Sequence, residues 1–399
     1  MKNQYYQPIY DFVSKCRIID THCHHMQQHE YADFSLNRVL SICYVAWSYG
    51  CDYDNPEERA HLVETIGTNT YFTWFAKALS ELYADGTPLN TENWDAIDAA
   101  IRAKYAEDPY YHIHILEDIC HYEGIVLDKY ERPGYDNGRP SLFKPTFRCD
   151  SFLCAHIRGV TDENKTDPYA YFDVQPASLA EYIAMMEETI VKKKAEGCCA
   201  LKIAIAYERG LDFEDVPYEA AEAAFGNPDP TPEEKKRFTD YVMYRIAEIA
   251  AKLDIPIQIH TGLGILQKSN AMQLRDLIDA NPKTNFVLFH GSYPWMDDVL
   301  GLACRYRNVY PDTCWLPIIS TSAAIRFLSE ALEVTDAYRL TWGCDTWNSE
   351  ESYGALLAMR HVLATVLSEK VEMGEYTFDY ACRVAENILY NNAKKIYHL

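Results

Sequence analysis

The 399-residue chain lacks the long apolar stretches that mark membrane proteins. Its longest apolar run, residues 198–206, is interrupted by Lys202, whereas a helix that crosses a bilayer needs 18 or more apolar residues. The amino terminus also lacks the apolar segment and small-residue cleavage site of a secretory signal. These absences predict a soluble protein that does not enter a membrane.

Basic residues are scarce as well. Lys and Arg total 37 against 59 Asp and Glu, which gives a formal net charge of −22. Such a charge opposes binding to the phosphate backbone of nucleic acids and to anionic lipid. We therefore expect a small-molecule substrate as the partner, and neither nucleic acid nor a membrane surface.

The cysteines do not form a disulfide framework. There are 13 of them, an odd number, scattered from Cys16 to Cys382 without any C-x-x-C pair. Disulfide-rich secreted domains are short and carry an even number of cysteines. The pattern predicts a reducing, cytoplasmic location.

Short apolar runs alternate with amphipathic stretches, which is typical of repeated βα units around a parallel sheet. Strands are expected at residues 17–24, 124–128, 144–152, 199–206, 255–260, 285–290, 309–312 and 339–344. Eight strands with intervening helices predict an α/β fold of the (β/α)₈ TIM-barrel type, as a single domain over residues 1–399. A doubly wound open sheet is the alternative, although no G-x-G-x-x-G follows the first strand as its dinucleotide-binding version requires.

Helices are expected between the strands. The clearest begins after Thr231, an N-cap residue followed by Pro232 and, at the third helical position, Glu234. Between the first two strands, residues 35–121 show helical periodicity, for example at residues 71–83 and 94–105. We expect this segment to form a helical cap inserted after the first strand, on the face where barrels carry their active sites.

The first strand ends in the sequence Asp20-Thr21-His22-Cys23-His24. Side chains two residues apart on a strand share one face, so His22 and His24 can reach the same point. Imidazole is the commonest metal ligand in proteins. A second H-x-H, His112 and His114, lies in a stretch expected to be helical, where residues two apart diverge.

Other ligand-type residues also stand at strand ends. His260 closes the fifth run, His290 closes the sixth, Asp345 follows the eighth, and Lys202 lies late in the fourth. The carboxyl ends of all barrel strands meet at one mouth. The sequence therefore predicts that these residues join His22 and His24 around one metal-binding cavity.

On these residues the chain resembles the amidohydrolase superfamily of metal-dependent barrel enzymes. The resemblance is closest to the branch that includes the amidohydrolase-like domains of nodulin/glutamine-synthetase fusion proteins, and it covers most of the chain. It rests on the first-strand H-x-H and on the stretches LKIAIAYERGL (residues 201–211), IQIHTG (257–262), FHGSYP (289–294) and NVYPD (308–312). The chain has Gly343-Cys344-Asp345 where the superfamily pattern leads us to expect Gly-Ser-Asp.

The resemblance implies roles for the strand-end residues. His22, His24 and Asp345 would hold one metal ion, with His260 joining them or bridging toward a second ion. Zn²⁺ is the expected ion, with Mn²⁺, Fe²⁺ and Ni²⁺ as alternatives. Asp345 would serve as the proton shuttle, and a carbamylated Lys202 together with His290 would hold a second ion. An uncarbamylated Lys202 would instead bind a substrate carboxylate or oxyanion. For His290 the alternatives are that it polarises the substrate or that it is a strand-end histidine with a structural role only.

Arg148 and Arg209 are candidates for binding a substrate carboxylate, because the guanidinium fork matches it. A salt bridge at the barrel rim is the alternative for each. Tyr207 and Trp342 are further substrate-binding candidates, and Asp128, His25 and Trp347 have strand-end or loop positions that place them near the same pocket.

The expected function is that of a metal-dependent hydrolase with one or two ions, which cleaves an amide, lactone or related bond of a small polar, carboxylated substrate. Two alternatives stay open. One is a mononuclear decarboxylase or sugar-acid isomerase, and the other is a non-catalytic regulatory barrel. A homo-oligomer is compatible with all three.

Overall fold

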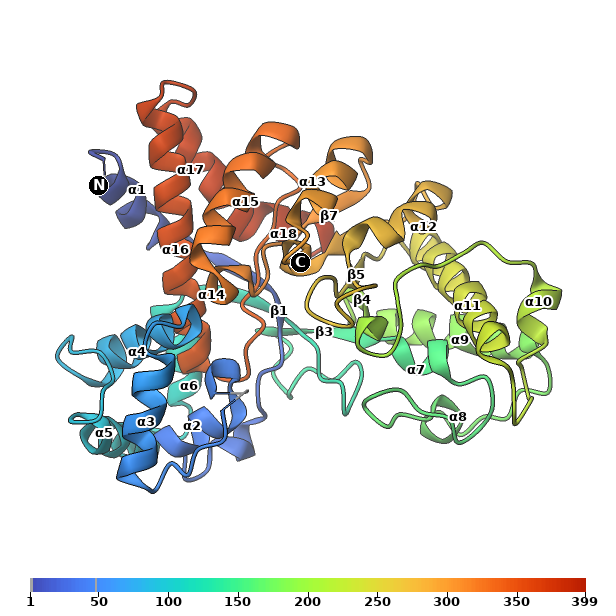
Figure 1. The fold of residues 1–399 in the computed structure, drawn as a ribbon, viewed down its shortest axis with the longest axis horizontal. Helices are drawn as coiled ribbons and strands as arrows, with labels where there is room; N and C mark the ends of the chain where they lie inside the picture. The colour runs from blue at the N-terminus through green and yellow to red at the C-terminus, as the bar shows by residue number, and fades with distance from the viewer. Residues whose placement is uncertain (1–2, 47–48) are drawn as a thin grey trace.

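The computed structural model describes residues 3–46 and 49–399. Its strands form one parallel sheet in chain order (Figure 1). They are β1 (Ile18–Cys23), β2 (Tyr122–Leu127), β3 (Phe143–Arg148), β4 (Ala200–Ile203), β5 (Ile257–Ile259), β6 (Phe286–Leu288) and β7 (Val309–Pro311). Most strand residues are buried and apolar, as expected when helices cover both faces of a parallel sheet. This is an α/β, TIM-barrel-like arrangement.

The predicted eighth strand is observed as a bridging segment instead. Thr341 forms an isolated parallel bridge with Asp312. On the other side, Thr21 N donates to Trp342 O (3.2 Å) and Asp345 N donates to His22 O (2.8 Å). Gly343 permits this close approach, since a Cβ there would lie 2.7 Å from the backbone nitrogen of His22. The segment thus contacts β7 and β1 and carries Asp345 to the end of β1, without regular strand pairing.

Helices fill the connections. Between β1 and β2 lie α2 (Leu36–Ile42), α3 (Pro56–Ile66), α4 (Thr70–Tyr83), α5 (Trp94–Glu107) and α6 (Tyr111–His114). Elsewhere the chain forms α1 (Tyr6–Val13), α7 (Asp150–Cys154), α8 (Pro168–Tyr171), α9 (Leu179–Ala195), α10 (Tyr218–Glu222), α11 (Pro232–Leu253), α12 (Arg275–Ala280), α13 (Met296–Arg305), α14 (Leu316–Ile319), α15 (Thr321–Val334), α16 (Ser349–Glu372), α17 (Phe378–Glu386) and α18 (Asn392–Ile396). In the described part of the chain, none of them combines the length and apolar character of a bilayer-spanning helix.

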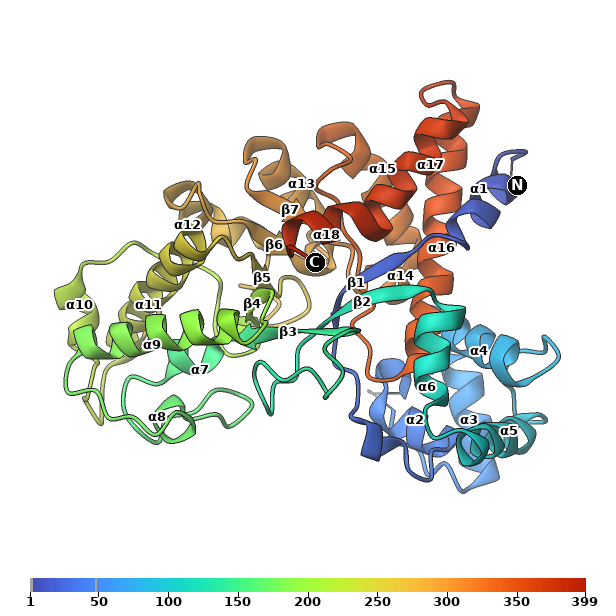
Figure 2. The ribbon, with the colours of Figure 1, turned by 180° about the vertical axis from the view of Figure 1, so that it is seen from behind.

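The helices α2 to α6 gather in one group beside α16 (Figures 1 and 2). Tyrosine hydroxyls from this group donate to two buried carboxylates at the start of α16: Tyr83 and Tyr105 to Glu350 (2.6 and 2.8 Å), and Tyr71 to Glu351. The observed α4 and α5 confirm the helices predicted at residues 71–83 and 94–105.

Local sequence signals account for the start of α11. The Thr231 hydroxyl accepts a hydrogen bond from the backbone N–H of Glu234, and the Glu234 carboxylate accepts one from the backbone N–H of Thr231, which completes the predicted capping box. The third strand, in contrast, is shorter than the predicted residues 144–152. It ends at Arg148, and α7 begins at Asp150, whose carboxylate accepts Ala204 N. An apolar run alone does not distinguish a buried strand from a buried helix.

Candidate active site

A cavity of about 380 Å³ lies at the carboxyl ends of the strands. Five of the sequence-predicted residues that line it are ligand-type side chains: His22, His24, Lys202, His260 and Asp345. His290 lies directly beside them, fully buried. The structure therefore brings together all six residues that the sequence predicted around one metal site.

The ring of His24 is oriented by the backbone. Its Nδ1 lies 2.9 Å from the carbonyl oxygen of Asp128, so this nitrogen carries the proton and donates it. In neutral His24 the other nitrogen, Nε2, then has a lone pair, and it faces Asp345 Oδ1 at 3.1 Å. Asp345 Oδ1 is buried and has no hydrogen-bond partner in the described chain. Either a metal ion between these atoms or a proton on Nε2 would reconcile the two acceptors at this distance.

The same situation recurs at His260 and His290. His260 Nε2 lies 2.9 Å from Leu263 O, and His290 Nδ1 lies 2.9 Å from Cys314 O. The nitrogens left over, His260 Nδ1 and His290 Nε2, face each other at 3.0 Å. Burial lowers the pKa of His260 well below its usual value and that of His290 to about 4, so a shared proton is disfavoured at neutral pH. These donor sets fit a metal ion, since metal-bound histidine uses one neutral nitrogen and donates from the other.

Asp345 connects the two pairs. Its Oδ1 lies 3.1 Å from His24 Nε2 and 3.9 Å from His22 Nε2, and its Oδ2 lies 3.7 Å from His290 Nε2. Burial alone would raise the pKa of Asp345, but the contacts with His24 and His22 hold it well below the usual value. The carboxylate is thus ionised and placed to serve ions in either pair.

Lys202 lies between the first pair and the core. Its Nζ is 3.4 Å from His22 Nε2 and 4.1 Å from the centre of the Phe289 ring. Burial lowers the pKa of the amine to about 8. A lysine with this pKa has a sizeable neutral fraction near neutral pH, which is the form that reacts with carbon dioxide to give a carbamate.

The rest of the wall is aromatic, with two charged groups and an amide. Tyr207, predicted from the sequence, packs against His260 with ring centres 4.5 Å apart and the rings tilted by 41°. Arg148 lines the cavity but is already paired with buried Asp128, through Nη2 (2.6 Å) and Nε (3.2 Å). Its Nη1 lies 3.6 Å from a carboxylate oxygen of buried Asp150, so two buried acidic groups already hold the guanidinium.

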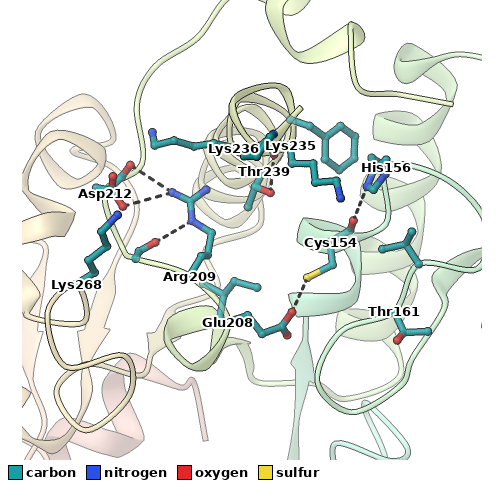
Figure 3. Close-up of a pocket in the computed structure, with 15 residues that line it drawn as sticks. Cys154, His156, Thr161, Glu208, Arg209, Asp212, Lys235, Lys236, Thr239 and Lys268 are labelled. Atoms are coloured by element: carbon teal, nitrogen blue, oxygen red, sulfur yellow. Dashed lines mark hydrogen bonds and ion pairs between the residues drawn. The ribbon is translucent and has the colours of Figure 1, made fainter. Parts of the chain in front are cut away.

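Three of the sequence-predicted side chains lie elsewhere. Trp342 is fully buried in the core, and His25 packs against Phe143 and Ser352. Arg209 lines a neighbouring cavity of about 440 Å³, where its Nη1 donates to buried Asp240 at 2.7 Å. Figure 3 shows its guanidinium directed toward Asp212. The salt-bridge alternative is the one observed for Arg209.

Several cavity residues escaped the sequence analysis: Tyr44, Tyr130, Glu163, Asn164 and Trp315. Trp315 follows β7 by four positions, so the strand-end argument could have found it. Tyr44 belongs to the segment between β1 and β2 and has no local signal. Trp347, which the sequence placed near the pocket, does line it.

Comparisons with known proteins identify sequences and structures that are similar to this chain. A family model described as Amidohydrolase matches residues 211–399. The curated protein fluG of Emericella nidulans is 25% identical over 96% of this chain, which spans 46% of the length of that protein.

Three solved structures share the fold. A putative metal-dependent hydrolase from Lactobacillus casei is 21% identical, with a TM-score of 0.71 over 98% of this chain and 97% of that one. A uronate isomerase from Thermotoga maritima (17%, TM-score 0.80, 99% and 97%) and a glucuronate isomerase from Caulobacter crescentus (17%, TM-score 0.76, 99% and 94%) are also similar. At these identities the likeness establishes a shared fold and leaves the reaction open.

Proposed function

We propose that the protein is a metal-dependent hydrolase of the amidohydrolase superfamily, which cleaves an amide, lactone or related bond of a small polar, carboxylated substrate. The observation that supports this best is a pair of contacts between acceptor atoms, His260 Nδ1 to His290 Nε2 (3.0 Å) and His24 Nε2 to Asp345 Oδ1 (3.1 Å), which bound metal ions would satisfy. The match of residues 211–399 to the amidohydrolase family supports it. The four quoted sequence stretches support the nodulin-type branch.

Zn²⁺ is the proposed ion, because imidazole and carboxylate ligands suit it, although Mn²⁺, Fe²⁺ and Ni²⁺ use similar ligands. His22, His24 and Asp345 would hold one ion, and His260, His290 and a carbamylated Lys202 a second. When bound, such an ion lowers the pKa of water and polarises the substrate carbonyl.

Asp345 then performs the proton transfers. It is ionised, buried and in contact with the histidines on both sides, so it can accept a proton from the attacking water and deliver it to the leaving group. The aromatic walls exclude bulk water and leave about 380 Å³ for the substrate. Arg148, which lines the cavity while paired with Asp128 and Asp150, would bind a substrate carboxylate at one side.

A mononuclear sugar-acid isomerase or decarboxylase is the second candidate. The observation that favours it is the position of Lys202 Nζ over the Phe289 ring at 4.1 Å, which suits an ammonium. In that case Lys202 would bind substrate, and a single ion would remain.

Elemental analysis of the purified protein tests both candidates. Two metal equivalents in wild type, falling to one or none in Lys202→Ala, would support the hydrolase. One equivalent, lost in His22→Ala but kept in Lys202→Ala, would favour the isomerase or decarboxylase, and uronates would be the first substrates to assay. His112→Ala is the matched control, because buried His112 belongs to the other H-x-H and stacks on Tyr31. No bound metal in wild type would contradict both and favour a regulatory barrel.

A further inference from the structure

Cys314 lies beside the candidate metal site without a role in it so far. It follows β7, three residues after Pro311, and its side chain is fully buried. Its Sγ, a ring nitrogen of His290 and a carboxylate oxygen of Asp345 all lie within 4.8 Å of one another. Ligands around one ion are a few ångströms apart, so these three atoms are close enough to share one.

The backbone holds Cys314 in this place. Its N–H donates to Asp312 Oδ1 at 2.7 Å, and the other oxygen of Asp312 accepts the hydroxyls of Thr21 (2.7 Å) and Thr341 (2.8 Å). Its carbonyl oxygen accepts His290 Nδ1–H at 2.9 Å. Cys314 therefore orients the His290 ring and presents its own sulfur to the same site.

The surroundings favour a ligand over a space-filling side chain. Two observations fit a metal ion here: the buried Asp345 Oδ1 without a hydrogen-bond donor, and the facing ring nitrogens of His260 and His290 at 3.0 Å. In the described residues the thiol of Cys314 has no hydrogen-bond partner either.

We propose that Cys314 supplies a thiolate ligand to a metal ion held by His290 and Asp345. The inference rests on the proposed metal-dependent function and extends it. On binding, the S–H bond breaks, a sulfur–metal bond forms and the proton leaves to solvent, with no change of oxidation state. Because thiolate is a soft ligand, this position would favour Zn²⁺ over Mn²⁺.

Cobalt substitution tests the inference directly. The full-length protein is stripped with a chelator and reloaded with Co²⁺, and its near-ultraviolet absorption is recorded, since a thiolate on cobalt gives an intense sulfur-to-metal charge-transfer band. The band should be present in wild type and absent in Cys314→Ser and Cys314→Ala. The zinc Kd should rise by at least about 10-fold in both variants.

Cys23→Ser is the matched control. Cys23 is equally buried, and its sulfur likewise lies within 4.8 Å of ligand atoms of a carboxylate, Asp20, and an imidazole, His25. Retention of the band in this variant is expected. Loss of the band in Cys23→Ser with retention in Cys314→Ser would overturn the inference and assign the thiolate to the Asp20 cluster.

The wild-type spectrum alone separates failure of the Cys314 inference from failure of the proposed metal-dependent function. Bound cobalt without a charge-transfer band would overturn the role of Cys314 and leave the metal-dependent function standing. No bound cobalt at all, measured by elemental analysis, would overturn both.

Discussion

Glu351 offers a quantitative test of how the cavity walls are held. One of its oxygens accepts the backbone N–H of Tyr44 (3.1 Å) and the hydroxyl of Tyr71, and the other accepts the N–H of Trp347 (2.8 Å). Tyr44 and Trp347 both line the cavity. A single buried carboxyl group therefore joins the segment between β1 and β2 to the loop after Asp345.

Burial raises the pKa of Glu351 from 4.5 to about 7. When a group binds its proton more tightly in the folded state, the free energy of unfolding falls as the pH rises from the pKa of the unfolded state to that of the folded state. At about 1.4 kcal/mol per pH unit, the total is about 3 kcal/mol, most of it between pH 5 and pH 8. Glu351→Gln has no such proton and should not show this loss.

The substitution also has a constant cost, since the amide NH₂ faces one of the buried N–H donors and leaves it unpaired, at about 1–3 kcal/mol. At pH 5 we therefore expect the variant to be less stable than wild type by that amount. Between pH 5 and pH 8, the free energy of unfolding of the variant should rise relative to that of wild type by about 2–3 kcal/mol.

Urea unfolding at pH 5 and pH 8, followed by circular dichroism with chelator present in all samples, measures both differences. Glu369→Gln, an exposed position on the same helix, is the control and should show the same offset from wild type at both pH values. An equal offset for Glu351→Gln at the two pH values would refute the reasoning.

Three further predictions concern the site and its surroundings. The Asp345→Asn variant should contain less metal than wild type, as measured by elemental analysis, and its turnover should be at least about 100-fold lower. Wild-type metal content together with wild-type turnover in this variant would show that Asp345 has no part in the proposed chemistry. Arg209→Gln should lower the free energy of unfolding by about 1–3 kcal/mol, because among the described residues buried Asp240 then keeps only Lys236 as a charged partner. The metal content of this variant should match that of wild type. A loss of metal would place Arg209 in the metal site. Zinc added to the stripped protein at 100 times its Kd should raise the free energy of unfolding by about 2.7 kcal/mol, and calorimetry that showed no rise in Tm would contradict a metal bound to the folded state.

Local sequence signals predicted those features of the fold that depend only on residues close together in the chain. The capping box at Thr231 is observed as expected, because such a cap is made within one turn of helix. Strand positions also followed from apolar runs, although their ends shifted. The eighth run did not form a strand, because residues 341–345 bond to two different neighbours on either side over only a few residues.

Where the structure places the predicted side chains depends on whether they lie at strand ends. His22, His24, Lys202, His260 and Asp345 lie at strand ends, and a parallel sheet brings such ends together whatever the loops do. Arg209 and Trp342 were placed by proximity along the chain alone. In the structure Arg209 forms an ion pair with Asp240 on α11, and the side chain of Trp342 is buried in the core.

The sequence by itself determined the α/β alternation, the periodic helices and the set of ligand-type residues that meet at one edge of the sheet, because strand period and strand direction are local properties. Only the tertiary structure decided which ring nitrogens keep a lone pair, that Asp345 lies between two histidine pairs, and that Tyr44 and Cys314 come to this site. These depend on hydrogen bonds between residues far apart in the chain, such as His24 with Asp128 and Tyr44 with Glu351, which no local pattern encodes.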